Sequence, residues 1–356
     1  MKINLLFSIL CIISSAVIKA QNLSAYTDYR NYFYVFDDGD FKNIEYNPIK
    51  SYKIGGNSVV YLNNSDNLKI YYKGSSYDFA DVTPEVFYAA DDIAAYTKDK
   101  ILTVFDRGRF HTLSALVNYY TVSDSLVGFF DETTSIFKVY YDGSIQELDA
   151  LNNVDFKVGS NTLAFVNRVG YFKIFYHDQV FEIETNQPES YKAACNTVAY
   201  VDGNSQSFKV FYNGTTVTLE NAPPTSYQVA ENIVAYVDNT GRFKVFCQGQ
   251  TAEVLSFEPL FYSTEDNIIV YDDKVHFKVF YKGTTYTLED YVPEEYQKDF
   301  NSLAYKDRDG YLKVFYDGET QRVSQEKINS FELSRNVVKF NTGLDDLHFF
   351  SKGKTY

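Results

Sequence analysis

The sequence predicts an all-β fold, a β-propeller of about ten short four-stranded blades, on two observations. A strand of the form Phe-Lys-Val-Phe-Tyr recurs along the chain at intervals of 34 to 36 residues. The hydrophobic positions follow no helical period of about 3.6 residues. A fixed period of this size is typical of an array of stacked repeats. The recurring strand begins at Phe33, Leu68, Leu102, Phe137, Phe172, Phe208, Phe243, Phe277, Leu312 and Leu347.

Each repeat is expected to contain four short strands, a to d. In residues 226–257 we predict strand a at 226–230, strand b at 233–237, strand c at 243–247 and strand d at 251–255. An Asn or Asp, such as Asn232, lies between strands a and b and tolerates the left-handed conformation. A glycine lies between strands c and d in every repeat except the one with His177-Asp178, which indicates a hairpin with positive φ.

Strands b and c are apolar on both sides, so each sheet needs a neighbour on each face. Radial stacking around an axis supplies both neighbours, although propellers usually have about four to eight blades. Two smaller propellers or an open β-solenoid are the alternatives, with a break expected at residues 106–135, where the repeat fits least well. The first repeat starts at strand b, near Tyr26, and the last ends in strand d at Tyr356. Strand a is therefore missing once.

Two segments carry a family resemblance. Residues 234–246 read Val-Ala-Tyr-Val-Asp-Asn-Thr-Gly-Arg-Phe-Lys-Val-Phe, and residues 303–315 read Leu-Ala-Tyr-Lys-Asp-Arg-Asp-Gly-Tyr-Leu-Lys-Val-Phe. Both resemble blades of TolB-like, WD40-like β-propeller repeat proteins, although the units are shorter than typical blades. The resemblance implies a fold and no activity. The absence of Trp and the abundance of Tyr and Phe resemble exported proteins of Bacteroidota.

The first twenty residues have the features of a secretory signal peptide, with a basic start, an apolar run and cleavage expected after Ala20. We therefore assign residues 1–20 to a signal peptide and 21–356 to the propeller domain, exported to the periplasm or the extracellular space. No later run reaches the roughly 18 apolar residues of a transmembrane helix. A net charge of −14 argues against nucleic acid as a partner.

Lysine recurs in strand c of seven repeats. The functional interpretation is an anion-binding belt around the ring. The structural interpretation, which we favour, is that each stem packs between blades while the amine reaches solvent or a carboxylate. The seven are Lys69, Lys138, Lys173, Lys209, Lys244, Lys278 and Lys313.

Acidic residues recur in the turns between strands b and c, on the face that propellers commonly use for binding. Ca²⁺ coordination and a carboxylate pair for sugar hydrolysis or lyase chemistry are two functional interpretations. The favoured alternative is that each Asp caps its own turn. The candidate binding residues are Asp202, Asp238, Asp272, Asp307 and Asp309, and Asp131 and Asp273 occupy similar positions.

No residue pattern indicates an enzyme. The four histidines lie at unrelated repeat positions without metal-like spacing, and Cys195 and Cys247 are interpreted as small packed side chains rather than a disulfide. We therefore expect no catalytic residue, no metal and no cofactor. The leading hypothesis is an exported, non-enzymatic scaffold that binds a protein or cell-surface partner through one propeller face. The alternatives are a carbohydrate-binding or carbohydrate-active propeller and a purely structural envelope protein.

Overall fold

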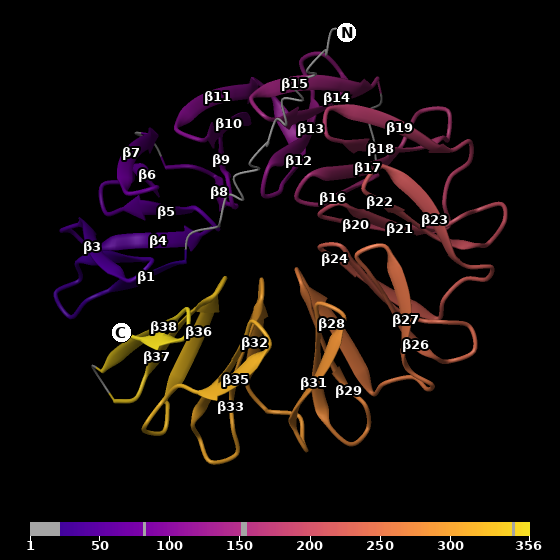
Figure 1. Ribbon diagram of the computed structural model, residues 1–356. Coiled ribbons are helices and arrows are strands. Elements are labelled where there is room, and N and C mark those ends of the chain that lie inside the picture. Colours follow the sequence, from indigo (N-terminus) through magenta and orange to yellow (C-terminus); the bar gives the residue numbers. More distant parts are fainter. Residues whose placement is uncertain (1–21, 81–82, 151–154, 344–345) are drawn as a thin grey trace, which may run out of the picture.

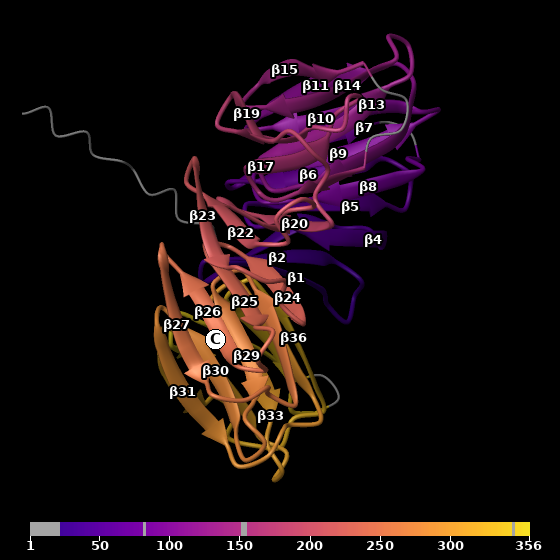
Figure 2. The same ribbon diagram turned by 90° about the vertical axis from the view of Figure 1, so that its right-hand side faces the viewer.

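A computed structural model describes residues 22–80, 83–150, 155–343 and 346–356. These residues form ten antiparallel sheets arranged as the blades of one ring (Figure 1). This confirms the predicted ten-bladed propeller and excludes both two smaller rings and an open solenoid. Figure 2 views the ring from its side, with blades 2–5 above blades 8 and 9. The predicted signal peptide lies outside the described residues.

The strands follow the chain in blade order. Blades 1 to 3 comprise β1 (Leu23–Thr27), β2 (Phe33–Asp37) and β3 (Asp40–Glu45); β4 (Ile49–Ile54), β5 (Ser58–Asn63), β6 (Leu68–Tyr72) and β7 (Ser75–Ala80); and β8 (Val86–Ala89), β9 (Ile93–Lys98), β10 (Ile101–Asp106) and β11 (Arg109–Ser114). Blades 4 to 6 comprise β12 (Val117–Val122), β13 (Leu126–Asp131), β14 (Ile136–Tyr141) and β15 (Ser144–Asp149); β16 (Phe156–Val158), β17 (Thr162–Val166), β18 (Phe172–Tyr176) and β19 (Gln179–Glu184); and β20 (Ser190–Ala194), β21 (Thr197–Val201), β22 (Phe208–Tyr212) and β23 (Thr215–Glu220). Blades 7 and 8 comprise β24 (Ser226–Ala230), β25 (Ile233–Val237), β26 (Phe243–Cys247) and β27 (Gln250–Leu255); and β28 (Phe261–Glu265), β29 (Ile268–Asp272), β30 (Phe277–Tyr281) and β31 (Thr284–Glu289). Blades 9 and 10 comprise β32 (Tyr296–Asp299), β33 (Ser302–Lys306), β34 (Leu312–Tyr316) and β35 (Glu319–Arg322); and β36 (Ser330–Ser334), β37 (Val337–Asn341), β38 (Leu347–Ser351) and β39 (Lys354–Thr355).

The strand pattern predicted for residues 226–257 matches blade 7. Three strands have the expected bounds, and β27 begins at Gln250, one residue earlier than predicted. Because consecutive strands are antiparallel, the a–b and c–d turns lie on one face of the ring. The b–c turns and d–a connections lie on the other face.

The hydrophobic core lies between blades. Ala199 and Val210 of blade 6, for example, pack in one buried cluster with Val234 and Phe246 of blade 7. The same packing continues through residues 106–135, because Val104 of blade 3 shares a buried cluster with Phe129 of blade 4. The break expected in this region is therefore wrong, since a weak sequence repeat still supplies apolar side chains to both faces of each sheet.

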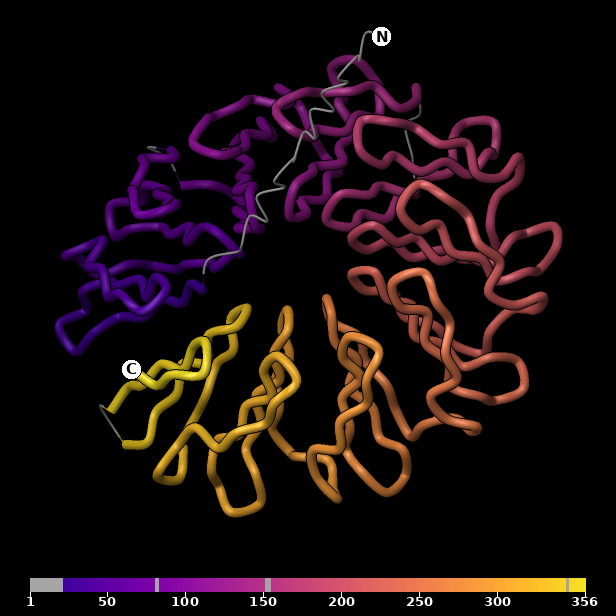
Figure 3. Tube along the Cα trace, viewed as in Figure 1, coloured from indigo at the N-terminus to yellow at the C-terminus, as the bar shows by residue number. Residues whose placement is uncertain are grey.

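The ring closes between blades 10 and 1 without a shared strand among the described residues. Among the described residues, the first sheet contains β1, β2 and β3, which correspond to strands b, c and d. The prediction that this blade lacks a strand a concerns residues before Asn22, outside the described part of the chain. Side chains close the seam instead: the rings of Phe36 and Phe349 stack with centroids 5.0 Å apart and an interplanar angle of 8°. Figure 3 shows blade 10, in yellow, beside blade 1, in indigo.

The c–d hairpin of blade 5 offers a small test of the turn chemistry. His177 and Asp178 both adopt positive φ, 46° and 59°, whereas the equivalent turn of blade 6 has Asn213 at 47° and Gly214 at 83°. A side chain in this conformation costs about 1 kcal/mol, which glycine avoids. We expect Asp178→Gly to raise the free energy of unfolding by about 0.5–1 kcal/mol in urea titrations. Gly214→Asp is the matched reverse substitution, and a stabilising effect of Gly214→Asp would contradict this explanation.

Candidate functional site

The a–b turns, which are two or three residues long, surround the axis on one face of the ring. Strand a is the innermost strand of blades 2 to 10, so the turn that follows it lies near the centre. The last turn residue is usually Asn, and its side chain often binds the equivalent residue of a neighbouring blade. Asn161 Nδ2 donates to Asn196 Oδ1 at 2.6 Å, and Asn196 Nδ2 donates to Asn232 Oδ1 at 3.2 Å. The predicted Asn therefore sets the turn, since Asn196 and Asn232 have φ of 57°, and also links neighbouring blades.

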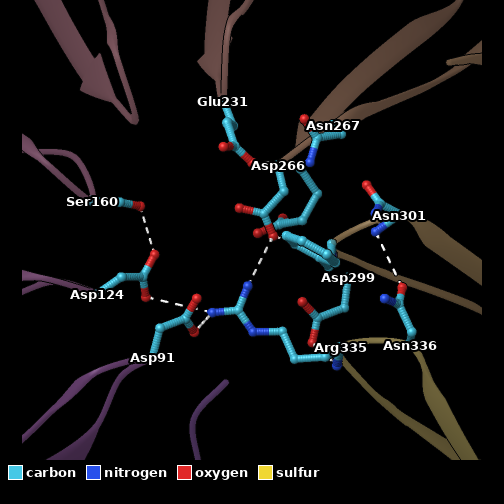
Figure 4. Close-up of polar contacts among 12 residues, drawn as sticks. Asp91, Asp124, Ser160, Glu231, Asp266, Asn267, Asp299, Asn301, Arg335 and Asn336 are labelled. Atoms are coloured by element: carbon cyan, nitrogen blue, oxygen red, sulfur yellow. Dashed lines mark hydrogen bonds and ion pairs between the residues drawn. The ribbon is translucent and has the colours of Figure 1, made fainter. Parts of the chain in front are cut away.

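Charged residues at or next to the first position of these turns form what we call the axial cluster (Figure 4). Arg335 of blade 10 extends across the axis, where its guanidinium forms ion pairs with Asp91 of blade 3, Asp124 of blade 4 at 3.5 Å and Asp266 of blade 8 at 3.7 Å. The axial cluster comprises Asp91, Asp124, Glu231, Asp266, Asp299 and Arg335. One guanidinium thus faces carboxylates from several blades.

Other hydrogen bonds hold these carboxylates in place. Asp266 Oδ2 accepts from the backbone N–H of Phe300 at 3.1 Å, and Asp299 Oδ2 accepts from the backbone N–H of Arg335 at 2.6 Å. Ser160 Oγ donates to Asp124 Oδ2 at 2.5 Å. Each of these bonds joins one blade to the next. The axial cluster therefore links neighbouring blades by hydrogen bonds and links blades across the axis by ion pairs.

The crowding of carboxylates shifts their titration. Burial, followed by repulsion from Asp299 and Asp124, raises the pKa of Asp266 to about 7. Burial raises the pKa of Asp299 to about 6, although the hydrogen bond from the Arg335 amide opposes this shift. Burial also raises the pKa of Asp124, and it lowers the pKa of Arg335 to about 10. A single guanidinium shared among several carboxylates does not offset their burial and mutual repulsion.

These shifts predict how stability depends on pH. The pKa values of Asp266 and Asp299 are higher in the folded state than the ordinary value of 3.8, so folding takes up protons between about pH 4 and pH 7. The free energy of unfolding should therefore fall by about 1–3 kcal/mol from about pH 5 to pH 8. Urea titrations at both pH values measure this change. Asp266→Asn should flatten the profile, and an unchanged slope in that variant would contradict the assignment.

Four of the five predicted acids of the b–c turns cap their own turns. Asp238 Oδ1 accepts from the backbone N–H groups of Thr240 and Arg242, at 2.8 and 3.0 Å. Asp202 and Asp307 accept from backbone N–H groups two residues further along in the same way, at 2.9 and 3.1 Å. Asp272 accepts from the Lys274 amide at 2.7 Å, whereas Asp309 is exposed. The five residues are thus spread over the turns of four blades.

Hydrogen bonding decides the ionisation of these capping acids. Burial alone would raise the pKa of Asp202, but hydrogen bonds from Lys209, the Asn204 amide and the Ser205 hydroxyl outweigh it and hold the pKa well below the usual range. The pKa of Asp238 is lowered for the same reason, by bonds from Thr240, Lys244 and Arg242. Both acids are therefore ionised at neutral pH. In the described part of the chain, no three His, Cys, Asp or Glu side chains form a group that could hold a metal ion.

The seven strand-c lysines all pair with carboxylates. Lys209 Nζ lies 2.8 Å from Glu184 of the preceding blade and 2.7 Å from Asp202 of its own blade, and Lys244 makes the same two contacts with Glu220 and Asp238. The remaining pairs are Lys69–Glu45, Lys138–Asp131, Lys138–Glu147, Lys173–Glu182, Lys278–Asp273, Lys313–Glu289 and Lys313–Asp307. The ammonium groups thus join strands and blades, and the anion-binding belt stays a prediction.

The recurring glutamate that receives these lysines was not identified from the sequence. In three blade interfaces it also accepts a hydrogen bond from the tyrosine of strand b: Tyr200 donates to Glu184 at 2.8 Å. Tyr236 and Tyr305 donate to Glu220 and Glu289 at 2.9 Å. The signal was visible, because a Glu ends strand d in each of these repeats.

The face formed by b–c turns and d–a connections carries exposed apolar side chains. Tyr29 is 84% exposed, Val169 69%, Leu260 67% and Val275 64%, and Tyr46, Leu116 and Phe257 are also exposed. In contrast, the two-residue c–d turns of the opposite face hold polar residues and glycine. A cavity of about 360 Å³ lies on the face formed by b–c turns and d–a connections. It is lined by Tyr291, Val292, Glu294, Glu295, Lys306, Asp307, Arg308 and Gly310. Asp307 is thus a predicted site residue that lines a cavity.

Two further expectations concern cysteine and the membrane. Cys195 and Cys247 are free, half-buried thiols, and burial raises the pKa of both. The described part of the chain contains no helix with the length and hydropathy needed to span a membrane.

Comparison with solved structures finds chains of low overall similarity. The computationally designed protein Ika8 is 19% identical, with 74% of this chain and 95% of Ika8 covered, at a TM-score of 0.34. The CRINKLY WD40 ectodomain of the receptor kinase ACR4 from Arabidopsis thaliana is 9% identical, with 68% of this chain and 99% of that chain covered, at 0.37. PorZ, a surface component of the type-IX secretion system of Porphyromonas gingivalis, is 10% identical, with 93% of this chain and 58% of that chain covered, at 0.27.

Curated proteins provide no match to this sequence. The TolB-like subtype and an origin in Bacteroidota stay predictions. A family model described as a 10-bladed beta propeller domain matches residues 17–356, which is nearly the whole chain. Together with the ten sheets of the ring, this match shows that the chain belongs to the family of 10-bladed beta propeller domains.

Proposed function

We propose that this protein is an exported, non-enzymatic scaffold that binds a protein partner through the face formed by its b–c turns and d–a connections. The observation that carries this proposal is the uneven distribution of exposed apolar side chains between the two faces. Exposed apolar side chains that gather on one surface are typical of protein-binding sites.

The exposed apolar side chains that support the proposal most directly lie where blades 7 and 8 meet. Phe257 and Leu260 belong to the connection into blade 8, and Val275 belongs to the b–c turn of that blade. The backbone N–H of Leu260 donates to the carbonyl of Asp272 at 3.0 Å, so connection and turn lie side by side. Lys274 Nζ lies 4.9 Å from the centre of the Phe257 ring. A partner would therefore meet apolar side chains on a backbone that is already ordered.

A carbohydrate-active propeller has less support. It would need a central pocket with two free carboxylates at a defined separation. Here Arg335 extends across the axis and pairs with three of the carboxylates that face it. The acids of the b–c turns are engaged by their own backbone and by lysines. Among the described residues, most carboxylates of both sets thus already have hydrogen-bond or ion-pair partners.

Capture of partners from the native envelope tests the proposal, with variants that place a charge on one surface or another. Leu260→Asp with Val275→Asp should reduce recovery of the partner at least tenfold, because a carboxylate would lie in the apolar contact. Val180→Asp with Val217→Asp is the matched control, since both residues are exposed on the outer strands β19 and β23. An equal loss of partner recovery in both double variants would contradict the assignment of the binding site to this face.

A glycan array with the same material tests the alternative. A specific glycan signal without recovery of a protein would overturn the proposal.

A further inference from the structure

The excess of negative charge is greater on the face formed by b–c turns and d–a connections than on the opposite face. Among the described residues, these segments contain 18 acidic and seven basic residues, whereas the a–b and c–d turns contain nine and five. A surface with an excess of one charge attracts a partner of the opposite charge and repels a partner of the same charge. The face proposed for binding therefore favours a basic partner.

Two neighbouring blades share one local arrangement on this face. Lys274 Nζ in the b–c turn of blade 8 lies 4.9 Å from the centre of the Phe257 ring, in the connection into that blade. In blade 9, the guanidinium of Arg308 lies 3.6 Å from the centre of the Tyr291 ring, in the equivalent connection. Each pair joins the second residue of a b–c turn to an aromatic residue two positions before a proline. The residues that follow the two prolines therefore hold equivalent places on the surface.

The residue that follows the proline differs in chemistry between the two blades. It is Leu260 in the connection into blade 8 and Glu294 in the connection into blade 9, and both residues are exposed. Within the part of the chain that the structure describes, the carboxylate of Glu294 has no hydrogen-bond or ion-pair partner. The surface thus changes from apolar to acidic between two neighbouring blades.

The cavity of about 360 Å³ on this face, which we call the acidic cavity, lies at the connection into blade 9. Its lining combines the apolar surfaces of Tyr291 and Val292 with the carboxylates of Glu294 and Glu295. A lysine or arginine side chain matches both features, because its aliphatic stem packs against apolar surface while its charged end reaches a carboxylate. The acidic cavity therefore has the chemistry expected of a site for one basic side chain.

Hydrogen bonds hold the walls of the acidic cavity together. The backbone N–H of Arg308 donates to the Tyr291 hydroxyl at 2.9 Å, and the backbone N–H of Lys306 donates to the Glu295 carbonyl at 3.1 Å. Both bonds join the connection into blade 9 to the end of strand b or the b–c turn of that blade. A site that is already ordered loses less conformational entropy when a partner binds.

Two cations of the chain also line the acidic cavity, and both have carboxylate partners. Lys306 Nζ lies 3.6 Å from Glu295, and the guanidinium of Arg308 lies 3.8 Å from Asp290. The four side chains are 29–77% exposed, so each ion pair is weak and can rearrange when another charge arrives. These cations therefore do not favour an anion in the acidic cavity, whereas Glu294 is available to a cation.

We propose that the acidic cavity receives a lysine or arginine side chain of the partner protein, from a segment that also places an apolar side chain against Leu260. This inference rests on the function proposed above and specifies the chemistry of its partner. The apolar contact supplies affinity, and the basic residue supplies the orientation of the segment across blades 8 and 9.

A synthetic peptide in which leucine and valine alternate with arginine and lysine over eight residues is a suitable probe. We expect the fluorescently labelled peptide to bind saturably in anisotropy titrations, with an affinity that falls as salt screens the charges. A second peptide with glutamate at every basic position should bind at least about tenfold more weakly. The absence of saturable binding at millimolar peptide, or equal affinity for the two peptides, would overturn the proposal.

Variants of the protein separate the acidic cavity from the general charge of the face. Glu294→Lys with Glu295→Lys should weaken binding of the basic peptide at least about tenfold, with the fold checked by circular dichroism. Asp78→Lys with Glu319→Lys is the matched control, because it changes the net charge equally at exposed residues of the outer strands β7 and β35. Equal weakening in both double variants would mean that long-range charge attracts the peptide, and it would overturn the assignment to the cavity.

Partner capture with the same variants distinguishes a failure of this inference from a failure of the proposed function. Recovery of the partner should fall at least about tenfold both in Leu260→Asp with Val275→Asp and in Glu294→Lys with Glu295→Lys. A loss in the first double variant alone would leave the proposed function standing and overturn the role of the acidic cavity. Unchanged recovery in both would overturn the proposed face and, with it, this inference.

Discussion

Replacement of Arg335 by Met should lower the free energy of unfolding by about 3–5 kcal/mol near pH 8, because removal of one partner leaves buried charges uncompensated. The guanidinium pairs with Asp91, Asp124 and Asp266 across the axis. Its side chain is 14% exposed, and those of the three carboxylates are 21–30% exposed. Methionine keeps most of the side-chain volume, so the loss would come mainly from charge.

The pH dependence of this loss separates charge from packing. Near pH 5, Asp266 is largely protonated, because its pKa is raised to about 7. The destabilisation by Arg335→Met should therefore be smaller near pH 5 than near pH 8, as urea titrations would show. Arg168→Met is the matched control, since Arg168 is exposed, and it should change stability by less than about 0.5 kcal/mol. An equal loss at both pH values would mean that packing dominates.

Removal of an aromatic side chain at the seam should lower the free energy of unfolding by a similar amount. It should also weaken the contact between the two end blades. Phe36 is fully buried and stacks on Phe349, so Phe36→Ala should lower the free energy of unfolding by about 3–5 kcal/mol. Phe246 is its matched control, because it holds the same position of strand c in blade 7 and is 1% exposed. The interface of Phe246 is also bridged by the chain between blades 6 and 7, whereas no described segment bridges the seam.

Hydrogen exchange distinguishes the two substitutions. Phe36→Ala should speed amide exchange in β1 to β3 and in β36 to β38 well beyond the change that Phe246→Ala causes in blades 6 and 7, because the end blades can then separate without unfolding the rest. Equal changes in exchange at both interfaces would contradict a weaker seam.

The repeat made the fold predictable, because it constrains each blade and its contacts with the next one. Strand bounds and turn residues both follow from a pattern of about 35 residues. The strand-c lysines and the capping aspartates have partners within their own or a neighbouring blade, which is typical of positions that serve a repeated structure. Their proposed ligand-binding roles stay predictions.

The axial cluster could not be predicted in the same way. A periodic sequence specifies contacts between neighbouring units, whereas Arg335 meets Asp91 and Asp124 more than two hundred positions away in the chain. Such contacts depend on the number of blades and on the width of the ring. One signal was present, because Arg335 is basic at a turn position where four other repeats have an acidic residue, namely Asp91, Asp124, Glu231 and Asp266.

The construction of each blade from consecutive residues has a consequence for how such a ring can change. Because no strand of the part of the chain that the structure describes is exchanged across the seam, the seam need not lie between blades 10 and 1. A circularly permuted chain that starts at β28 and joins Tyr356 to Gln21 by a short linker would keep every sheet intact. Gene duplication or loss of one unit would likewise leave all blades whole and alter only the curvature of the ring. The ion pairs that Arg335 forms across the axis would then be altered, since they require a ring of fixed diameter.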